Sequence, residues 1–293
     1  MSSPGNATSS TTSHVMANDA VRSRLHVLRA IAWFPLLAAA GLASCVPGSD
    51  QRADQDNPGT TLTILAYNIR HGEGNDDIVD LSRAAGVINA LGPDIVTLQE
   101  VDSAVDRTER VDQATVLGEL TGMHSVFGAF FDYQGGRYGM AVLSKLPIVG
   151  HQNHRLPDGL EPRTALATKI SLAESSEYIV VVGIHLYATA EERYAQAARL
   201  VEILQDEPMP IILAGDFNST PDSEVIDLLK KAGWYVPDKG TDNLTFGSDD
   251  PVREIDYIMV RPKERFEIDL LDVIDEPLVS DHRPVLLKLR LLQ

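Results

Sequence analysis

Short apolar runs of strand length recur from residue 60 to the C-terminus, and helical patterns separate several of them. This alternation predicts an α/β protein. Because some of the later runs follow one another with no helix between them, mixed sheets are favoured over a purely alternating barrel. The expected strands cover residues 62–67, 94–98, 140–143, 164–170, 178–184, 211–214, 255–260 and 285–291.

Three segments carry signals for the ends of helices. Asp77 is expected to cap the first helix, and Gly92 is expected to end it. Thr189 begins the second helix as part of a capping box. Thr220 is expected to cap a third helix that ends near Gly233.

The composition excludes several classes of protein. The chain has 293 residues, and 25 basic against 42 acidic residues give a formal net charge of −17. Hydrophobic residues make up 44% of the chain, too many for a largely disordered protein, and no apolar run reaches the ~20 residues of a membrane span. The acidic balance disfavours tight, unspecific nucleic-acid binding, which needs clustered Lys and Arg. The single Cys excludes an internal disulfide and a zinc site built on thiolates.

The N-terminal segment has the features of an export signal. Arg22, Arg24 and Arg29 precede an apolar stretch over residues 31–40, and small residues follow up to Cys45. The residues before Cys45 resemble a bacterial lipobox, which implies that Cys45 is lipidated and becomes the first residue of the mature protein. The alternative is a plain secretory signal with an incidental Cys.

Three parts of the chain are therefore expected. Residues 1–44 form a signal peptide of the lipoprotein type, with Met16 as an alternative start, and residues 45–59 form a flexible tether. Residues 60–293 form the folded body. The expected location is outside the cytoplasm, on the periplasmic or cell-surface side, with a lipid anchor in the membrane.

Polar residues with catalytic chemistry stand at the ends of the expected strands or directly before the last one. Taken singly, each of them is more often a turn residue or a solvated charge. Strand ends in α/β sheets gather at one edge, where ligands bind, so the set is expected to converge on one cleft. Its members are Asn68, Glu100, His185, Asp216, Asn218, Asp281 and His282.

This set of donors favours a hard divalent cation. Carboxylate oxygens from Glu100, Asp216 and Asp281, with amide oxygens from Asn68 and Asn218, suit Mg²⁺ or Mn²⁺. Mg²⁺ held by few carboxylates typically binds phosphate oxygens as well. The sequence therefore predicts a metal-assisted phosphoester hydrolase, in which a carboxylate takes a proton from water and imidazoles assist the phosphoryl group.

Asp256 is unusual because it lies inside an expected apolar strand. A buried Asp needs a partner such as a protonated imidazole, because an unpaired buried charge is costly. His282 is the partner that we expect.

A series of motifs resembles the endonuclease/exonuclease/phosphatase superfamily, in its order and across residues 60–293. No single motif is specific, but their combination is. The resemblance implies a four-layer α/β sandwich with two central mixed β-sheets flanked by helices, and phosphoester cleavage with Mg²⁺ or Mn²⁺. The motifs are Asn68-Ile69, Gln99-Glu100 and residues 138–144, 183–186, 215–218, 255–258 and 280–284.

The resemblance also implies roles for individual residues. Glu100 is then the principal metal ligand, with support from Asp281. Asp216 positions or deprotonates the attacking water, and His282, oriented by Asp256, contacts the scissile phosphate. The remaining site residues are His185, which assists the phosphate or the leaving group, and the substrate-binding residues Asn68, Asn218, Tyr138 and Arg163.

Two departures from the family pattern disfavour a nuclease of the repair type. Arg70 stands where that branch often has Asp, and Met140 replaces an amide after the Tyr-Gly pair. Arg107 and Arg163 lie in segments typical of a bacterial secreted subgroup, and either guanidinium is able to clamp a phosphate. For Arg107 a structural salt bridge is favoured.

Export and the lack of a basic stripe favour a phosphodiesterase or phosphatase acting on lipid headgroups or small phosphorylated metabolites. A secreted metal-dependent nuclease is the first alternative, and a catalytically silent binding module on the same fold is the second. Loops over residues 128–137 and 238–253 are expected to rim the cleft and to set its specificity.

Overall fold

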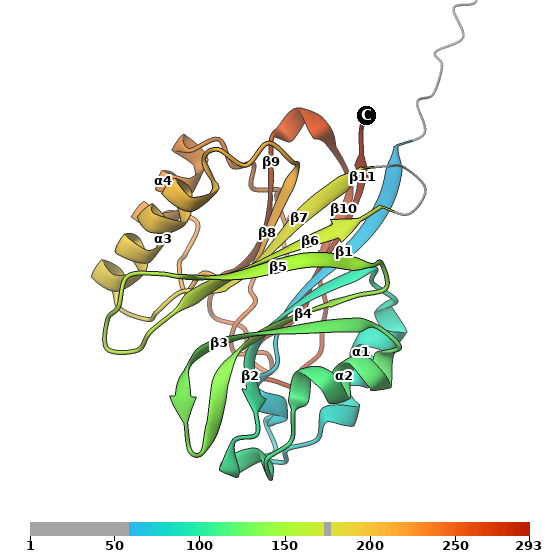
Figure 1. Ribbon diagram of the computed structural model, residues 1–293, viewed down its shortest axis with the longest axis vertical. Coiled ribbons are helices and arrows are strands. Elements are labelled where there is room, and N and C mark those ends of the chain that lie inside the picture. The colour runs from blue at the N-terminus through green and yellow to red at the C-terminus, as the bar shows by residue number, and fades with distance from the viewer. Residues whose placement is uncertain (1–58, 173–176) are drawn as a thin grey trace, which may run out of the picture. The chain divides into compact units, whose positions relative to one another are not determined.

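The computed structural model describes residues 59–172 and 177–293, and two mixed β-sheets form its centre (Figure 1). The first sheet has the order β10-β11-β1-β2-β4-β3 and the second β5-β6-β7-β8-β9. The first comprises β1 (Thr60–Asn68), β2 (Ile95–Ser103), β3 (His124–Tyr133), β4 (Gly136–Ser144), β10 (Phe266–Val273) and β11 (Val285–Leu291). The second comprises β5 (Ile148–Arg155), β6 (Thr164–Ser171), β7 (Tyr178–His185), β8 (Ile211–Asp216) and β9 (Asp256–Arg261).

Each sheet contains one parallel pair, β1–β2 in the first and β7–β8 in the second, and the other neighbours are antiparallel. Parallel strands end at the same edge of a sheet, so the ends of β1 and β2 are neighbours, as are those of β7 and β8. This pairing places the expected strand-end residues in two adjacent groups.

Helices cover the outer face of each sheet and complete the predicted four layers (Figure 1). α1 (Leu81–Leu91) and α2 (Gln113–Thr121) pack on the first sheet through residues such as Ile88 and Leu117. α3 (Ala190–Leu204) and α4 (Glu224–Lys231) pack on the second through Leu200 and Ile226. A third core lies between the sheets and includes Met140, so the residue that replaces the family amide is an apolar core residue here.

The helix ends differ in part from the expectation. Asp80 rather than Asp77 caps α1, because its side chain accepts a hydrogen bond from the Ser82 backbone N–H. The helix ends at Gly92 as predicted, in the left-handed conformation that glycine adopts without strain. Ser223 rather than Thr220 caps α4.

Some elements were not expected. β3, β5, β10 and α2 lay outside the predicted runs, and residues 128–137, expected as a loop, form the end of β3, the turn and the start of β4. β5 is an edge strand with mostly exposed side chains, so it lacks the apolar run of a buried strand. Asp256 opens β9 instead of interrupting it.

None of the helices in the described ranges is both long and apolar enough to cross a bilayer. The predicted signal peptide and tether, with Cys45, lie outside the described residues except for Gly59.

Candidate active site

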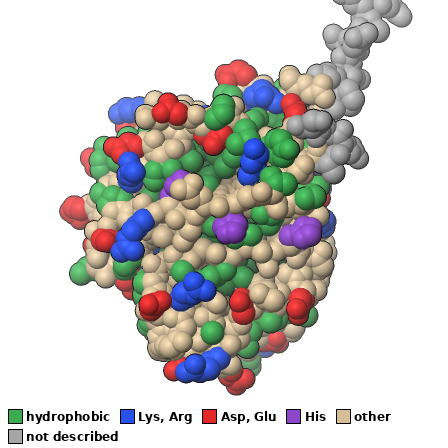
Figure 2. Space-filling view, viewed as in Figure 1, with side chains coloured by type: hydrophobic (Ala, Val, Ile, Leu, Met, Phe, Trp, Pro, Cys, Tyr) green, Lys and Arg blue, Asp and Glu red, His purple; other side chains and the backbone are tan. Residues whose placement is uncertain are grey.

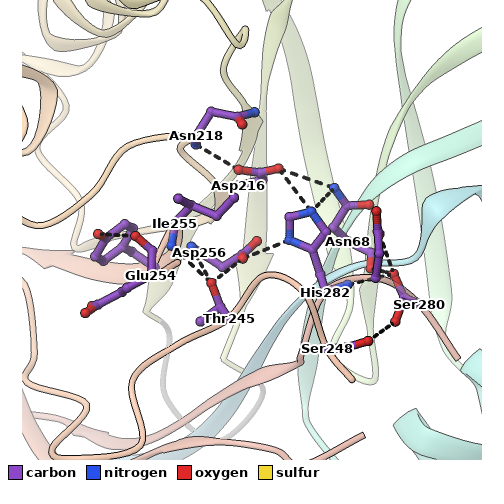
Figure 3. Close-up of polar contacts among 12 residues, drawn as sticks. Asn68, Asp216, Asn218, Thr245, Ser248, Glu254, Ile255, Asp256, Ser280 and His282 are labelled. Atoms are coloured by element: carbon purple, nitrogen blue, oxygen red, sulfur yellow. Dashed lines mark hydrogen bonds and ion pairs between the residues drawn. The ribbon is translucent and has the colours of Figure 1, made fainter. Parts of the chain in front are cut away.

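The amide of Asn68, the last residue of β1, links the two sheets (Figure 3). Its Nδ2 lies 3.1 Å from Glu100 Oε1 and 3.3 Å from Asp216 Oδ2, and both carboxylates accept from it. The same nitrogen is 3.4 Å from Nε2 of His282. Asn68 is itself buried. Its single amide group therefore lies among side chains from both sheets and from the segment before β11.

Glu100 reaches Asn68 from a β-bulge, so the expectation that it ends its strand is wrong. β2 continues to Ser103, and its register against β4 shifts between Gln99 and Val101. Glu100 has φ +59°, a conformation uncommon outside glycine. A bulge re-aims the extra residue away from the ladder, which here turns the Glu100 carboxylate toward the amide of Asn68.

Asp216 ends β8 and lies in register with His185 on one side and Asp256 on the other. Its Oδ2 is 3.4 Å from His185 Nε2, and its Oδ1 accepts from the backbone N–H of Asn218 at 2.8 Å. Asn218 donates its own Nδ2 to the Leu186 carbonyl at 2.9 Å, which ties the loop after β8 to the end of β7.

The predicted contact between Asp256 and His282 is present and buried (Figure 3). Asp256 Oδ2 lies 2.9 Å from His282 Nδ1 and also accepts from the hydroxyl of Thr245 at 2.6 Å. The ring of Phe246 packs edge-on against the imidazole, with centroids 4.9 Å apart. The loop that carries Thr245 and Phe246 therefore supports the pair, consistent with its expected place beside the cleft.

Burial and neighbouring charges set the protonation of the three central groups. Burial alone would lower the pKa of His282, but Asp256 outweighs it, with help from Asp216, and raises the pKa to about 10. Burial, followed by the charge of Asp256, raises the pKa of Asp216 to about 7. Burial and then the positive charge of Arg163 hold the pKa of His185 well below its ordinary value. At neutral pH, His282 is a cation and His185 is neutral.

Two groups of side chains carry oxygen atoms of the kind that a hard cation takes. Glu100 and Asp281 are half-exposed, and the ion pairs formed within the described part of the chain involve neither of them. Asp281 reaches Asn68 through Ser280, whose hydroxyl donates to the Asn68 carbonyl at 2.7 Å and lies 3.4 Å from Asp281 Oδ1. Asp216, Asp256 and His282 form a second group with ligand atoms within 4.8 Å of one another. There the imidazole already neutralises Asp256.

Tyr138 and the two arginines lie beside this centre. The buried ring of Tyr138 packs on Phe130 with centroids 5.6 Å apart, and burial followed by the charge of Glu100 raises the pKa of its hydroxyl. Arg107 donates to Asp102 through Nε and Nη2 at 2.8 and 2.9 Å, the salt bridge that was favoured for it. Arg163 is buried against the ring of Phe130, and that ring packs edge-on against His185.

Several supporting residues carried no recognisable signal in the sequence. Thr245 bonds Asp256, although nothing in its neighbourhood marks it as part of a site. His71 is buried in a short 3-10 turn after β1 and lies 3.1 Å from Glu73. Ser280 had a signal, because it belongs to the Ser-Asp-His motif, yet its bond to the backbone of Asn68 depends on the tertiary fold.

Comparisons with known proteins give consistent similarities. The sequence profile described as the Endonuclease/Exonuclease/phosphatase family matches residues 65–282. The uncharacterized protein YbhP of Escherichia coli (strain K12) is 28% identical over 240 residues, 77% of this chain and 94% of the relative. A solved endonuclease/exonuclease/phosphatase family protein from Bacteroides thetaiotaomicron has a TM-score of 0.69 at 20% identity and covers 80% of this chain and 99% of its own. The mannosyl-6-phosphatase Bt3783 of that species has a TM-score of 0.64 at 20% identity, with 78% and 99% covered.

Proposed function

The chain belongs to the endonuclease/exonuclease/phosphatase family, whose members hydrolyse phosphoesters, and on that premise we propose that it is a divalent-metal-dependent phosphodiesterase or phosphatase. The observation that carries the proposal is the position of Asn68. Its amide nitrogen donates to Glu100 and Asp216 and lies 3.4 Å from Nε2 of His282. Those groups supply a metal ligand, a base and a cationic donor at one point.

Glu100 and Asp281 would hold the metal ion, with the amide of Asn68 steadying the carboxylate of Glu100. Bound Mg²⁺ or Mn²⁺ would polarise a phosphate oxygen and offset the charge that develops on the phosphoryl group. Both carboxylates are half-exposed, so the site is open to an ion and to a substrate phosphate.

Asp216 and His282 are placed for complementary roles. A carboxylate with a pKa of about 7 is basic enough to take a proton from water near neutral pH. His282 carries a proton on Nε2, the atom on the Asn68 side of the ring, and is able to donate it to a phosphate oxygen. Asp256 keeps that imidazole charged and correctly oriented, because it holds the opposite nitrogen.

His185 has a different role because its imidazole is neutral. Its Nε2 faces Asp216 at 3.4 Å, where it is able to orient the carboxylate or to relay a proton. It adds no positive charge to the centre. We assign to His185 the exchange of a proton with the leaving group rather than the binding of the phosphate anion.

The proposed substrate class rests on the expected location of the protein and on its net charge. We place the enzyme outside the cytoplasm, held by a lipid on Cys45, with lipid headgroups or small phosphorylated metabolites as substrates. On the face in Figure 2, Lys and Arg side chains are scattered among acidic ones rather than gathered in a stripe. That distribution and the net charge of −17 disfavour a polyphosphate chain as the substrate.

The test is hydrolysis by the protein without its first 45 residues, on a panel of phosphomonoesters, phosphodiesters and plasmid DNA, with Mg²⁺, Mn²⁺ or a chelator. We expect metal-dependent cleavage of small esters and intact DNA. Asp216→Asn should reduce kcat by at least ~100-fold, because it removes the base, whereas Asp222→Asn, an exposed carboxylate after the same strand, should not. DNA degradation would favour the nuclease alternative, and no metal-dependent rate on any ester would favour the silent module.

A further inference from the structure

Arg283 directly follows the Ser-Asp-His motif, and each nitrogen of its guanidinium has a partner. Its Nε donates to the Ser248 carbonyl at 3.1 Å. Its Nη1 donates to Asp242 at 3.3 Å, and its Nη2 donates to Asp275 at 2.8 Å. The side chain is only 11% exposed. Because its three nitrogens are all bonded within the protein, this guanidinium is not directed at a substrate phosphate.

The two carboxylate partners of Arg283 are exposed, whereas its carbonyl partner is buried. Asp242 is 67% and Asp275 is 76% exposed, so water and salt screen both ion pairs and each contributes little. Ser248 is fully buried. A charged donor gives a carbonyl a stronger hydrogen bond than a neutral donor does, and losing it leaves a buried acceptor unpaired. We therefore expect the bond to the Ser248 carbonyl to contribute most.

Ser248 belongs to the loop before β9 and holds the segment that carries the motif (Figure 3). Its hydroxyl donates to the Ser280 carbonyl at 2.5 Å, and its backbone N–H donates to the Asp281 carbonyl at 3.0 Å. The same hydroxyl accepts from Asn75 Nδ2 at 2.8 Å, which fixes its orientation. Through Ser248, the side chain of Arg283 is thus connected to the backbone of Ser280 and Asp281.

The same loop and segment also pair beside the imidazole. The backbone N–H of Arg283 donates to the Thr245 carbonyl at 2.7 Å, and Phe246 forms an isolated antiparallel bridge with His282. Thr245 in turn bonds Asp256, the partner of His282. So short a pairing of two segments is only marginally stable by itself. The side chain of Arg283 adds a bond at the end of this pairing.

Resting on the proposed function, we infer that Arg283 is a positioning residue for metal binding and catalysis. Asp281 is a proposed metal ligand and His282 is the proposed donor to the phosphate, and both lie on the segment that Arg283 and Ser248 hold. Groups that orient a metal ligand from behind change metal affinity or activity about 10–100-fold when they are replaced. Arg283 acts through Asp281 and His282 rather than by contact with the substrate.

The first test is hydrogen exchange, which needs neither metal nor turnover. The backbone N–H groups of Gly247 and Ser248 both donate to the Asp281 carbonyl, so their exchange reports whether the loop and the motif segment stay together. We expect Arg283→Gln to speed exchange of both amides at least ~10-fold, because a charge-assisted hydrogen bond corresponds to a factor of about ten or more. The amides of β8 should keep their protection. Unchanged exchange at the two amides, or an equal rise in β8, would overturn the inference.

Arg290→Gln is the matched control, because Arg290 lies on β11 and also pairs with two carboxylates, Glu267 and Asp269. It removes the same charge and should leave the two amides protected. Arg283→Lys keeps the charge but cannot span three partners as a guanidinium does, so it should recover only part of the protection. Asp275→Asn keeps the bond to the Ser248 carbonyl and should keep the protection. Full recovery in Arg283→Lys, or a loss in Asp275→Asn as large as in Arg283→Gln, would show that charge pairing suffices and would refute the inference.

The second test measures metal affinity and turnover. Titration calorimetry should give at least ~10-fold weaker binding of Mg²⁺ or Mn²⁺ in Arg283→Gln than in Arg290→Gln. On the small ester that the wild-type protein cleaves best, with saturating metal, kcat should fall at least ~10-fold and KM should change less than ~3-fold, because the affected groups act in the transition state. A rise in KM alone would contradict the inference, because it would indicate that Arg283 contacts the substrate.

The two tests separate this inference from the proposed function. Faster exchange and weaker metal binding in Arg283→Gln, with no hydrolysis of any ester by the wild-type protein, would refute the hydrolase and leave the positioning role of Arg283 standing. Hydrolysis by the wild-type protein that is equally fast in Arg283→Gln and Arg290→Gln would support the hydrolase and refute the positioning role.

Discussion

Replacing Asp256 with Asn tests the buried ion pair at the centre of the site. Both side chains are 5% exposed or less, and Asp256 Oδ2 lies 2.9 Å from His282 Nδ1. The pKa of His282 is raised from 6.5 to about 10 in spite of burial, which by itself lowers it. At 1.36 kcal/mol per pKa unit, the difference corresponds to about 5 kcal/mol, close to the ~3–5 kcal/mol lost when one partner of a buried pair is removed.

The assay is NMR titration of the His282 imidazole in the presence of a chelator, because a metal ion near Asp281 would add its own charge. In Asp256→Asn we expect the pKa of His282 to fall from about 10 toward or below its ordinary value of 6.5. Burial is the largest single effect on the pKa of His282 and lowers it. In the variant, Asp216 opposes that effect without the help of Asp256.

The same variant changes how stability depends on pH. A raised pKa of a His in the folded state means that the pair stabilises fully below the unfolded pKa of ~6.5 and loses its effect as pH rises through about 10. Urea unfolding should therefore show a loss of about 3–5 kcal/mol in Asp256→Asn at pH 6. The loss should shrink steadily between pH 7 and 10.

Asp102→Asn is the control, because Asp102 is equally buried but pairs with Arg107, which does not titrate in this range. It should be destabilising at every pH and should leave the pKa of His282 unchanged. A wild-type His282 that titrates near 6.5, or one that keeps its raised pKa in Asp256→Asn, would refute the reasoning.

Four further changes have defined outcomes. Glu100→Lys should abolish saturable binding of Mg²⁺ or Mn²⁺ in calorimetry, because it reverses the charge of the main ligand, and retained metal-dependent hydrolysis would contradict the assignment. Gly215→Ala should cost at least ~3 kcal/mol in urea unfolding, because φ is +141° and a Cβ would lie 2.1 Å from the Ile184 carbonyl oxygen. Gly86→Ala, at an open position of α1, should instead add about 0.8–1 kcal/mol. Cys45→Ala in the full chain should move the protein from the membrane fraction to the soluble one, and a variant that stays with the membrane would show that the anchor is elsewhere.

Buried strands could be predicted from the sequence, and edge strands could not. β1 from Ile64 to Tyr67 and β8 from Ile211 to Ala214 are continuous apolar runs because both of their faces are covered. β5 is largely exposed and polar, and its pairing with β6 is set by the fold rather than by its own composition. The start of α4 was misplaced because Thr220 and Ser223 are both good caps, and only the geometry shows that Ser223 accepts the backbone N–H.

The convergence of the site could be predicted from strand ends, but its exact geometry could not. Asn68, His185 and Asp216 stand at strand ends, and the topology brings them together as expected. Glu100 arrives through a bulge, a feature that depends on the register between β2 and β4 and leaves no mark on the local pattern. The salt bridge favoured for Arg107 is present. Its partner Asp102, and the partner of Arg163, Glu161, could be identified only in the folded chain.

The hydrogen bond between the Asn68 amide and Asp216 crosses from one sheet to the other, which has a mechanical consequence. Asn68 and Glu100 belong to one sheet and Asp216 to the other, so a slip of one residue between the sheets, ~3.3 Å, exceeds the tolerance of the hydrogen bond between Asn68 and Asp216. The apolar layer between the sheets therefore also sets the distance between the site residues of one sheet and those of the other. Larger or smaller side chains in that layer would change the distances between the site residues, although none of the site residues themselves had been replaced.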